Sequence, residues 1–357
     1  MHRRVPSKEI CARTSHQEGE GSSLTVSSTI ADAYHGRTIL ITGGRGYIGS
    51  ALTQALANVH CKLILLDRSP LDAWVPDRRD AEISIVTGDV STRHTWDTVL
   101  PGVDYVFHLA GLEYMRSSVY DPILDLQCNA LPVLHLVEEC RRHRYCPHIV
   151  FSSSANVFGL VDSLPVDEDN RDNPLIPWAV HKVMAESHLR IYAKSHGIKS
   201  IILRLANVYG PTARRSAMSR VVINKMIADA IAGKSLTLYA NQHCVRDYIF
   251  VDDVVCALLL AGTDRSLLDG RFYVIGSGEG RTISEVCQLI ADKVSVRTDQ
   301  HVPIHVEELA KTDAFEMRDF VADTTRFRQA TGWKPMMGLE QGIDVTIESL
   351  TMAGSLK

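Results

Sequence analysis

From residue 37 onward, short apolar runs rich in β-branched residues alternate with helix-length amphipathic segments. The strand-like runs read TILITGG, KLILLDR, ISIVTGDV, DYVFHLAG, HIVFSSS and SIILRLANVYG. Strands that alternate with helices form parallel sheets, because each crossover helix returns the chain to the starting edge and covers one face of the sheet. The pattern predicts an α/β fold with a Rossmann-like, doubly wound parallel sheet.

After Gly210 the pattern changes to a polar helix over residues 219–232 and then to a mixed α/β ending. We therefore expect a smaller mixed α/β lobe that is interleaved with the first. The predicted division gives residues 37–210 and 245–275 to the Rossmann domain and residues 211–244 and 276–357 to a substrate-binding lobe.

The first 36 residues are rich in Ser, Thr, Glu, Gly and basic residues, without the continuous apolar segment of a secretory signal. This composition predicts a flexible N-terminal extension. The alternative is a short helix over residues 29–34 that packs on the folded body.

Composition narrows the classes of partner. Of 357 residues 45% are hydrophobic, which is enough for a substantial core, and the net charge is −4 with both signs interspersed. No basic stripe is present, so neither a nucleic acid nor an anionic membrane surface is expected as a partner. Apolar stretches such as residues 254–262 are far shorter than the roughly 20 residues of a membrane helix.

The eight cysteines show no CxxC spacing. Reduced, mostly buried thiols fit this pattern better than disulfides or a zinc site, so we expect a cytoplasmic protein without a metal centre.

A glycine-rich turn follows the first strand and opens a helix. Gly43 and Gly46 permit a tight turn and close approach of the backbone, and Gly49 permits close contact between helix and strand. The free N–H groups of the helix N-terminus then face a pyrophosphate. Asp67 ends the next strand about 20 residues later, where a carboxylate accepts hydrogen bonds from ribose hydroxyls. Together these features predict a dinucleotide site.

Asp67 also disfavours NADP, because its charge repels a 2′-phosphate. Arg45 and Arg68 lie close enough in sequence to offset that repulsion. NAD is therefore the expected cofactor and NADP the less favoured one.

Seven motifs occur in order between residues 38 and 349: TGGRGYIGS, GDV, HLAG, SSSANVFG, LRLANVYGP, VRDYIFVDDVVCALLLA and GWKP. In these the chain resembles the extended short-chain dehydrogenase/reductases, and within them the NAD-dependent sugar-nucleotide epimerase/dehydratase family, whose best-known member is UDP-glucose 4-epimerase. The resemblance implies a nucleotide-diphosphate sugar as substrate.

The resemblance also assigns residues to the two ligands. The positions that it places at the cofactor are Gly43, Gly46, Tyr47, Ile48, Gly49, Asp67, Arg68, Asp89, Val90, Leu109, Ala110, Asn129, Ser152 and Lys182. The positions that it places at the substrate are Ser118, Asn156, Asn207 and Arg246. A guanidinium at position 246 grips phosphate oxygens bidentately. The family's second diphosphate arginine is missing near residues 311–313, and Lys311 or Arg318 is the candidate to replace it.

The family's catalytic helix carries YxxxK, whereas this chain reads Trp178-Ala-Val-His181-Lys182. In the family the tyrosine moves the proton of a sugar hydroxyl, and the lysine one turn later lowers the phenol's pKa. An indole has one N–H donor, no acceptor and no accessible ionisation, so Trp178 lacks that capacity. Ser154 and Lys182, the other catalytic positions, are retained.

Three explanations of Trp178 remain open. Another group supplies the acid/base, with His181 the first candidate because its ordinary pKa suits proton transfer, and Glu113 and Tyr114 the next. Alternatively, the substrate or an ordered water carries the proton. In the third explanation Trp178 stacks on a ligand and no turnover occurs.

The leading hypothesis is an epimerase that oxidises and re-reduces a nucleotide sugar by hydride transfer to bound NAD. The Asp-Glu pair of sugar 4,6-dehydratases is replaced by Ala155-Asn156, which disfavours that reaction. The alternatives are an inactive NAD and nucleotide-sugar binding protein and a reductase of another small substrate.

The resemblance further implies a homodimer. The pairing helices are expected over residues 125–144 and 179–196. The residues considered for the pairing face are His135, Leu136, Ile191 and Tyr192.

Overall fold

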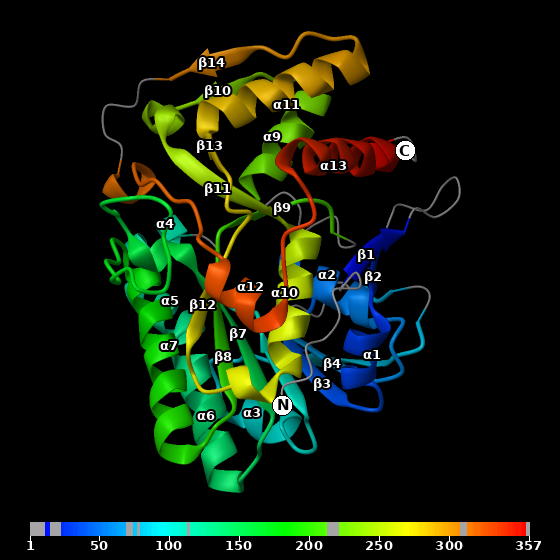
Figure 1. The fold of residues 1–357 in the computed structure, drawn as a ribbon, viewed down its shortest axis with the longest axis vertical. Coiled ribbons are helices and arrows are strands. Elements are labelled where there is room, and N and C mark those ends of the chain that lie inside the picture. Colours follow the sequence, from blue (N-terminus) through cyan, green and yellow to red (C-terminus); the bar gives the residue numbers. More distant parts are fainter. Residues whose placement is uncertain are drawn as a thin grey trace.

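The computed structural model describes residues 11–14, 23–68, 74–76, 79–112, 115–212, 221–307 and 313–354. Two lobes lie one above the other, with the large parallel sheet in the lower lobe and a smaller lobe at its upper end (Figure 1). Among the helices of these residues, none combines the length and hydropathy needed to cross a bilayer.

The larger lobe is built on a seven-stranded sheet in which every neighbouring pair is parallel. Across the sheet the strands are β12 (Phe272–Ile275), β8 (Ser200–Leu205), β7 (His148–Ser154), β6 (Tyr105–His108), β3 (Thr38–Thr42), β4 (Lys62–Asp67) and β5 (Glu82–Thr87). This confirms the predicted fold class. The strand order reverses between β3 and β6, and a crevice opens at such a reversal beyond the carboxyl ends of the strands.

Helices cover both faces of the sheet because alternate strand residues point to opposite sides. Ile39 and Ile41 face one core, which they share with α1 (Ser28–Tyr34), α2 (Tyr47–Leu56) and α10 (Val251–Thr263). Leu40 faces the other core, formed with α3 (Arg93–Val99), α6 (Leu131–His143) and α7 (Pro177–His196). Two short helices, α4 (Met115–Tyr120) and α5 (Pro122–Asn129), precede α6 and contact α7.

In its described residues the smaller lobe combines short strands with three α-helices. Its strands are β9 (Asn207–Tyr209), β11 (Val245–Phe250) and β13 (Gly280–Thr282) in one sheet, and β10 (Leu236–Leu238) and β14 (Ile304–Val306) in another. Its helices are α9 (Val222–Ile231), α11 (Ile283–Thr298) and α13 (Leu339–Gly354). The three-stranded sheet is mixed, since β11 pairs antiparallel with β13 and parallel with β9, whereas β10 and β14 are parallel.

Three parts of the chain depart from the predicted division, since β9 and β11 belong to the smaller lobe although the pattern assigned residues 207–209 and 245–250 to the Rossmann domain. Helix α12 (Thr325–Thr331) carries Phe327, which is fully buried with Trp333 in the core of the larger lobe. The indole of Trp333 donates to the carbonyl of Asp253 at 3.1 Å. Residues 325–333 therefore return to the larger lobe, although the pattern assigned them to the smaller one.

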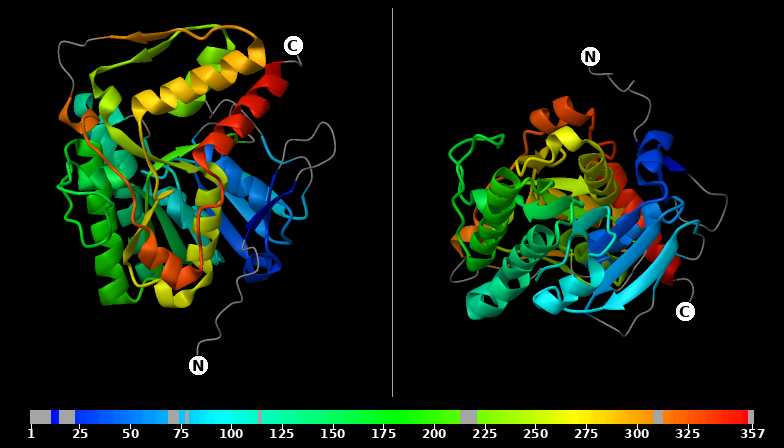
Figure 2. Two further views of the ribbon diagram at one scale, coloured as in Figure 1. Left: turned by 45° about the horizontal axis from the view of Figure 1, so that its top comes forward. Right: turned by 90° about the horizontal axis from the view of Figure 1, so that it is seen from below.

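The N-terminal region is more ordered than its composition predicts. A hairpin of β1 (Cys11–Thr14) and β2 (Ser23–Val26) precedes α1, and Ser27 caps α1 by accepting from the N–H of Ile30. Tyr34 is fully buried and its hydroxyl donates to the carbonyl of Leu259 at 2.6 Å. Residues 28–34 thus form the short helix that was the alternative to a flexible extension, and α1 lies on the outside of the larger lobe (Figure 2).

We expect Tyr34→Ala to lower the free energy of unfolding by about 3–5 kcal/mol, the usual cost of removing a buried aromatic side chain. The cavity would lie under α1, next to Tyr105 and Phe107. Urea denaturation measures the change, and Thr29→Ala on the exposed side of the same helix is the matched control. Equal stability of the two variants would contradict the docking of α1.

Candidate active site

A cavity of about 1210 Å³ lies between the lobes, beyond the carboxyl ends of the central strands. Both lobes contribute to its wall, with Gly43, Asp67 and Ser154 from the larger and Ile223 and Leu238 from the smaller. Pockets for a single drug-sized ligand hold roughly 300–1,000 Å³. The cavity is therefore large enough for a dinucleotide and a second ligand together.

The glycine turn forms one end of the cavity. Gly43 has a φ of +65°, and a Cβ there would lie 3.0 Å from the backbone of Ala110. A Cβ on Gly49 would lie 2.0 Å from the carbonyl oxygen of Gly43, so only glycine fits. Helix α2 starts directly after Gly46, and Tyr47 and Ile48 of its first turn line the cavity. The exposed N–H groups at this helix end make an anion site.

The end of β4 lies beside this turn, because the N–H of Gly43 donates to the carbonyl of Leu66 at 2.8 Å. Asp67 and Arg68 follow and line the cavity, as do Asp89 and Val90 after β5. The predicted ribose carboxylate and the glycine turn thus belong to one cavity.

A buried oxygen without a partner lies behind the wall near Lys182. The amide of Asn129 is 1% exposed and donates to Asp125 at 2.9 Å, while its Oδ1 has no hydrogen-bond partner among the described residues. A Cβ on Gly111 would lie 2.5 Å from that oxygen. An unpaired buried acceptor is costly unless a ligand supplies a donor. With the glycine cradle and Asp67, this oxygen fits a dinucleotide, whose ribose offers hydroxyl donors.

The end of β7 contributes hydroxyl groups. Ser152 and Ser154 line the cavity with Asn156, and the Ser154 hydroxyl accepts from the backbone N–H of Asn156 at 3.2 Å. Ser153 instead donates to the buried carboxylate of Glu186 at 2.5 Å. That bond ties β7 to α7.

Lys182 lines the cavity although it is only 8% exposed. Its Nζ donates to the carbonyl of Ser152 at 3.2 Å and lies 4.9 Å from the ring centroid of Phe151. Burial lowers the pKa of Lys182 to about 8, and the negative charges of Asp125 and Glu186 oppose that shift. The pKa of the ammonium therefore lies close to physiological pH.

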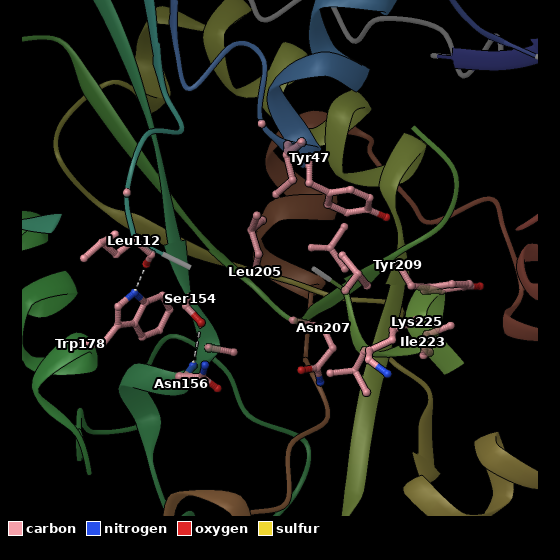
Figure 3. A pocket seen from close by; sticks show the side chains of 18 of the residues that line it. Tyr47, Leu112, Ser154, Asn156, Trp178, Leu205, Asn207, Tyr209, Ile223 and Lys225 are labelled. Carbon is pink, nitrogen blue, oxygen red and sulfur yellow. Dashed lines mark hydrogen bonds between the residues drawn. The ribbon is translucent and has the colours of Figure 1, made fainter. Parts of the chain in front are cut away.

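Trp178 forms the wall next to Lys182, with 5.7 Å between Nζ and its ring centroid. The indole N–H donates to the carbonyl of Leu112 at 2.7 Å, and the ring packs in an apolar cluster with Phe315. Figure 3 shows the indole turned toward Leu112, with Ser154 beside it. The one donor of the indole is already used, so Trp178 presents only carbon to a ligand.

The side chain of His181 points away from the described cavity wall. Its Nδ1 lies 2.6 Å from the Oδ2 of the fully buried Asp125, and the ring is not part of the cavity wall formed by the described residues. This geometry does not support His181 as the replacement for the tyrosine, because consecutive residues of a helix project about 100° apart and Lys182 is the one that faces the cavity.

Ser118 also departs from expectation. It is buried beneath the start of α7, where its hydroxyl accepts from the N–H of Trp178 at 3.3 Å, and it does not line the described part of the cavity. Glu113, Tyr114 and Lys311 lie outside the described residues.

At the other end of the cavity lie two buried guanidinium groups, those of Arg246 and Arg318, which are 5% and 8% exposed. Arg246 donates to the carbonyls of Val245, Arg318 and Glu316, and Arg318 donates to that of Phe315. Among the described residues, neither has a salt bridge with a carboxylate. Asp247, the neighbour of Arg246 in sequence, accepts from Ser277, Gly278 and Ala322.

A guanidinium has five N–H donors. Arg246 uses three in the bonds above and a fourth toward the sulfur of Cys244, and Arg318 uses one, which leaves one and four. Burial, and then the charge of Arg246, lower the pKa of Arg318 to about 10. Two buried like charges with free donors are unfavourable unless an anion binds between them. Asn207 lines the same region and donates to the carbonyl of Asp247 at 3.0 Å.

Phe315 and Cys128 are among the wall residues that sequence reasoning missed. Phe315 lies in a single 3₁₀ turn without periodicity, and Cys128, whose Sγ lies 3.9 Å from Arg68, gave no motif. Neither carries a local signal, because each reaches the cavity through tertiary packing.

Residues 39–276 match the family described as NAD dependent epimerase/dehydratase. UDP-glucose 4-epimerase of Azospirillum brasilense is 31% identical over 320 residues, which cover 85% of this chain and 89% of that protein.

Two solved structures share the fold at higher coverage. UDP-glucose 4-epimerase of Thermus thermophilus, in complex with NAD, is 28% identical with a TM-score of 0.75, covering 88% of this chain and 99% of that one. UDP-glucose 4-epimerase of Thermotoga maritima with UDP-glucose is 28% identical with a TM-score of 0.77, covering 90% and 100%. Since the family match spans most of the chain, and the curated relative agrees with it, the chain belongs to the NAD-dependent epimerase/dehydratase family.

Proposed function

We propose that this protein is an NAD-dependent nucleotide-sugar epimerase with an atypical acid/base. One observation carries the proposal: a single cavity joins a glycine-lined helix end and Asp67 to two buried guanidiniums that lack a carboxylate partner among the described residues. Relatives have been solved with NAD and with UDP-glucose, which are the two ligand classes that this arrangement fits.

The cofactor end is assigned as follows. The helix N-terminus after Gly46 receives the pyrophosphate, and Asp67 accepts from the adenosine ribose, which favours NAD over NADP. Lys182 and the orphaned Oδ1 of Asn129 hold the hydroxyls of the other ribose. When bound, the nicotinamide accepts a hydride from a sugar carbon and later returns it.

The substrate end follows from the arginine pair. Arg246, Arg318 and Asn207 hold the diphosphate, so the sugar extends toward Ser154 and Trp178. The Ser154 hydroxyl orients the reacting sugar hydroxyl by a hydrogen bond. The keto-sugar then rotates in the pocket and receives the hydride on the opposite face of its carbonyl, which inverts the configuration of that carbon.

A second candidate is favoured by Trp178, whose only donor is used by Leu112 and which has no acceptor. If no other group moves the proton, the protein binds NAD and a nucleotide sugar without turnover. Incubation with a panel of UDP-, GDP- and dTDP-sugars, followed by NMR of the sugar and by the absorbance of reduced nicotinamide, separates the two.

Conversion to an epimer is the expected result, and Ser154→Ala should slow it while leaving nucleotide binding intact. Binding without conversion or absorbance change across the panel would favour the inactive binding protein. Absence of any NAD affinity would remove both candidates.

The same helices that carry the site expose an apolar face. Val180, Met184 and Ile191 on α7 are 47%, 40% and 59% exposed, and Ile123 on the adjoining α5 is 64% exposed. Exposed apolar patches of this kind mark protein interfaces. We propose that a second copy of the chain covers these apolar side chains of α5 and α7. Leu136, considered for this face, is fully buried in the protomer's own core and is excluded.

Val180→Glu combined with Ile191→Glu is expected to convert the dimer to a monomer, because each carboxylate would be desolvated at the interface. Sedimentation velocity measures the change. Val296→Glu, at an exposed apolar residue on α11, is the control. A wild-type protein that sediments as a monomer at all concentrations would contradict the interface.

A further inference from the structure

We propose that Lys182 itself removes the proton of the sugar hydroxyl and later returns it. Trp178 cannot perform this proton transfer, because an indole has no acceptor and no accessible ionisation. This inference rests on the proposed function. It assigns to the lysine a role beyond holding the cofactor ribose.

The first support is the position of Nζ. It lies in the cavity wall between Ser152, to whose carbonyl it donates, and the ring of Trp178 at 5.7 Å. An ammonium has three donors, and the protein uses one of them. The faces of Phe151 and Trp178 lie beside it, and no carboxylate of the described residues forms a salt bridge with it. The unpaired Oδ1 of Asn129 lies on the same side, next to Gly111. The amine is therefore open to a ligand hydroxyl.

The second support comes from the other ionisable groups of the described wall. Asp67, Arg68, Asp89 and Cys128 lie at the adenosine end, whereas Arg246, Glu316 and Arg318 lie at the diphosphate end. Lys225, Asp229 and Glu307 come from the smaller lobe. The tyrosines of the wall are Tyr47 of α2 and, from the smaller lobe, Tyr209, Tyr239 and Tyr248. None of them belongs to the segment of wall formed by Ser154, Trp178 and Leu112.

The two nearby histidines do not replace Lys182. His181 is bound to Asp125 outside the wall. His108 is buried behind the wall with its Nδ1 2.8 Å from Thr42, and burial, followed by the charge of Lys182, lowers the pKa of His108 to about 3.

The third support is the charge environment of the amine. Three titratable groups face it: Asp125 from α5, Glu186 from α7 and His108 from β6. The two carboxylates raise the pKa of Lys182, but burial outweighs them and brings it to about 8. About one molecule in ten then holds a neutral amine at pH 7. An indole at position 178 brings no phenolate charge that would hold the ammonium, so the charged form is favoured only by the two carboxylates and by the ring faces of Phe151 and Trp178.

The step balances as follows. The lone pair of the neutral amine takes the hydroxyl proton, so that the O–H bond breaks and an N–H bond forms on Nζ. The C–O bond becomes C=O as the C–H electron pair leaves with the hydride that the dinucleotide accepts. On return of the hydride, Nζ gives the proton back to the oxygen, and the amine is neutral again.

Amine rescue tests the proposal. Lys182→Ala, assayed at saturating NAD, is expected to lower kcat by about 10²–10⁴-fold, the usual contribution of general acid–base catalysis. Added methylamine and ethylamine should restore part of that loss, and less basic amines should restore less. Lys182→Arg should remain inactive with or without amines, since a guanidinium does not deprotonate. Lys194→Ala, an exposed lysine on the same helix, should keep the wild-type rate.

A second readout needs no turnover. NMR of lysine labelled at the side chain should show one amine whose pKa lies near 8 and whose signal disappears in Lys182→Arg. The wild-type kcat/KM should rise with pH, with its midpoint at the same pKa, and reach a plateau above it, because the neutral amine is the reactive form. An amine that titrates at its ordinary value near 10.4 would overturn the proposal.

The two proposals fail in different ways. An inactive wild-type protein at every pH tested would sink the proposed function. An active wild-type protein whose Lys182→Ala variant is not rescued by any amine, or keeps its rate, would sink the role of Lys182 alone.

Discussion

Replacement of Arg246 and Arg318 together by leucine is expected to raise the dissociation constant for a nucleoside-diphosphate sugar by about 10³-fold or more. Truncating one partner of a buried, hydrogen-bonded charge pair costs about 2–5 kcal/mol, and about 1.4 kcal/mol corresponds to a factor of ten. Both guanidiniums lie at one end of the cavity with donors that the protein does not use. Each single variant is expected to lose less than the pair, because the other arginine still faces the phosphates.

Isothermal titration with UDP and with NAD measures the two ends of the cavity separately. NAD affinity serves as the internal control, since the adenosine end is formed by Asp67 and the glycine turn. Arg246→Lys retains the charge but loses the fork that donates to Arg318 and Glu316, so it should bind more weakly than wild type and more tightly than leucine. Unchanged UDP affinity in the double variant would contradict a diphosphate site there.

The parallel sheet and its glycine turn were predictable because their signals are local. Alternation of apolar strands with amphipathic segments sets the fold class, and a glycine turn between strand and helix needs little beyond its own neighbours. Gly49 illustrates this, since its missing Cβ leaves room for the carbonyl of Gly43, six residues earlier. The reversal of strand order then brings Asp67 to the same crevice.

The rest of the site depends on contacts between distant segments. Arg318 reaches Arg246 only because residues 313–320 fold back against β11. No periodicity or motif in the sequence predicts this packing. His181 and Lys182 are neighbours in sequence, but the helix turns one toward Asp125 and the other toward the cavity. The helix over residues 29–34 was only the alternative to a flexible extension, because its one large buried side chain, Tyr34, is surrounded by polar sequence.

Trp178→Tyr is expected to raise the rate of epimerisation by about ten- to a hundredfold at pH 6, where Lys182 is almost fully protonated. The pKa of Lys182, about 8, leaves roughly one molecule in a hundred with a neutral amine at that pH. A phenol at position 178 would stand one helical turn before the ammonium and beside Ser154, which restores the family's pairing. The ammonium then stabilises the phenolate, so that proton transfer no longer requires the neutral form of Lys182.

The variant also carries a structural cost, and its control must share it. Tyrosine removes the indole N–H that donates to Leu112, and a buried acceptor left without a donor costs about 1–3 kcal/mol. Trp178→Phe loses the same bond without adding a hydroxyl, so thermal unfolding should shift equally in both variants while only tyrosine gains rate. A loss of activity in both would mean that the indole belongs to the native chemistry. If neither variant alters activity or ligand affinity, position 178 does not take part in the site, and a missing hydroxyl at that position does not limit the reaction.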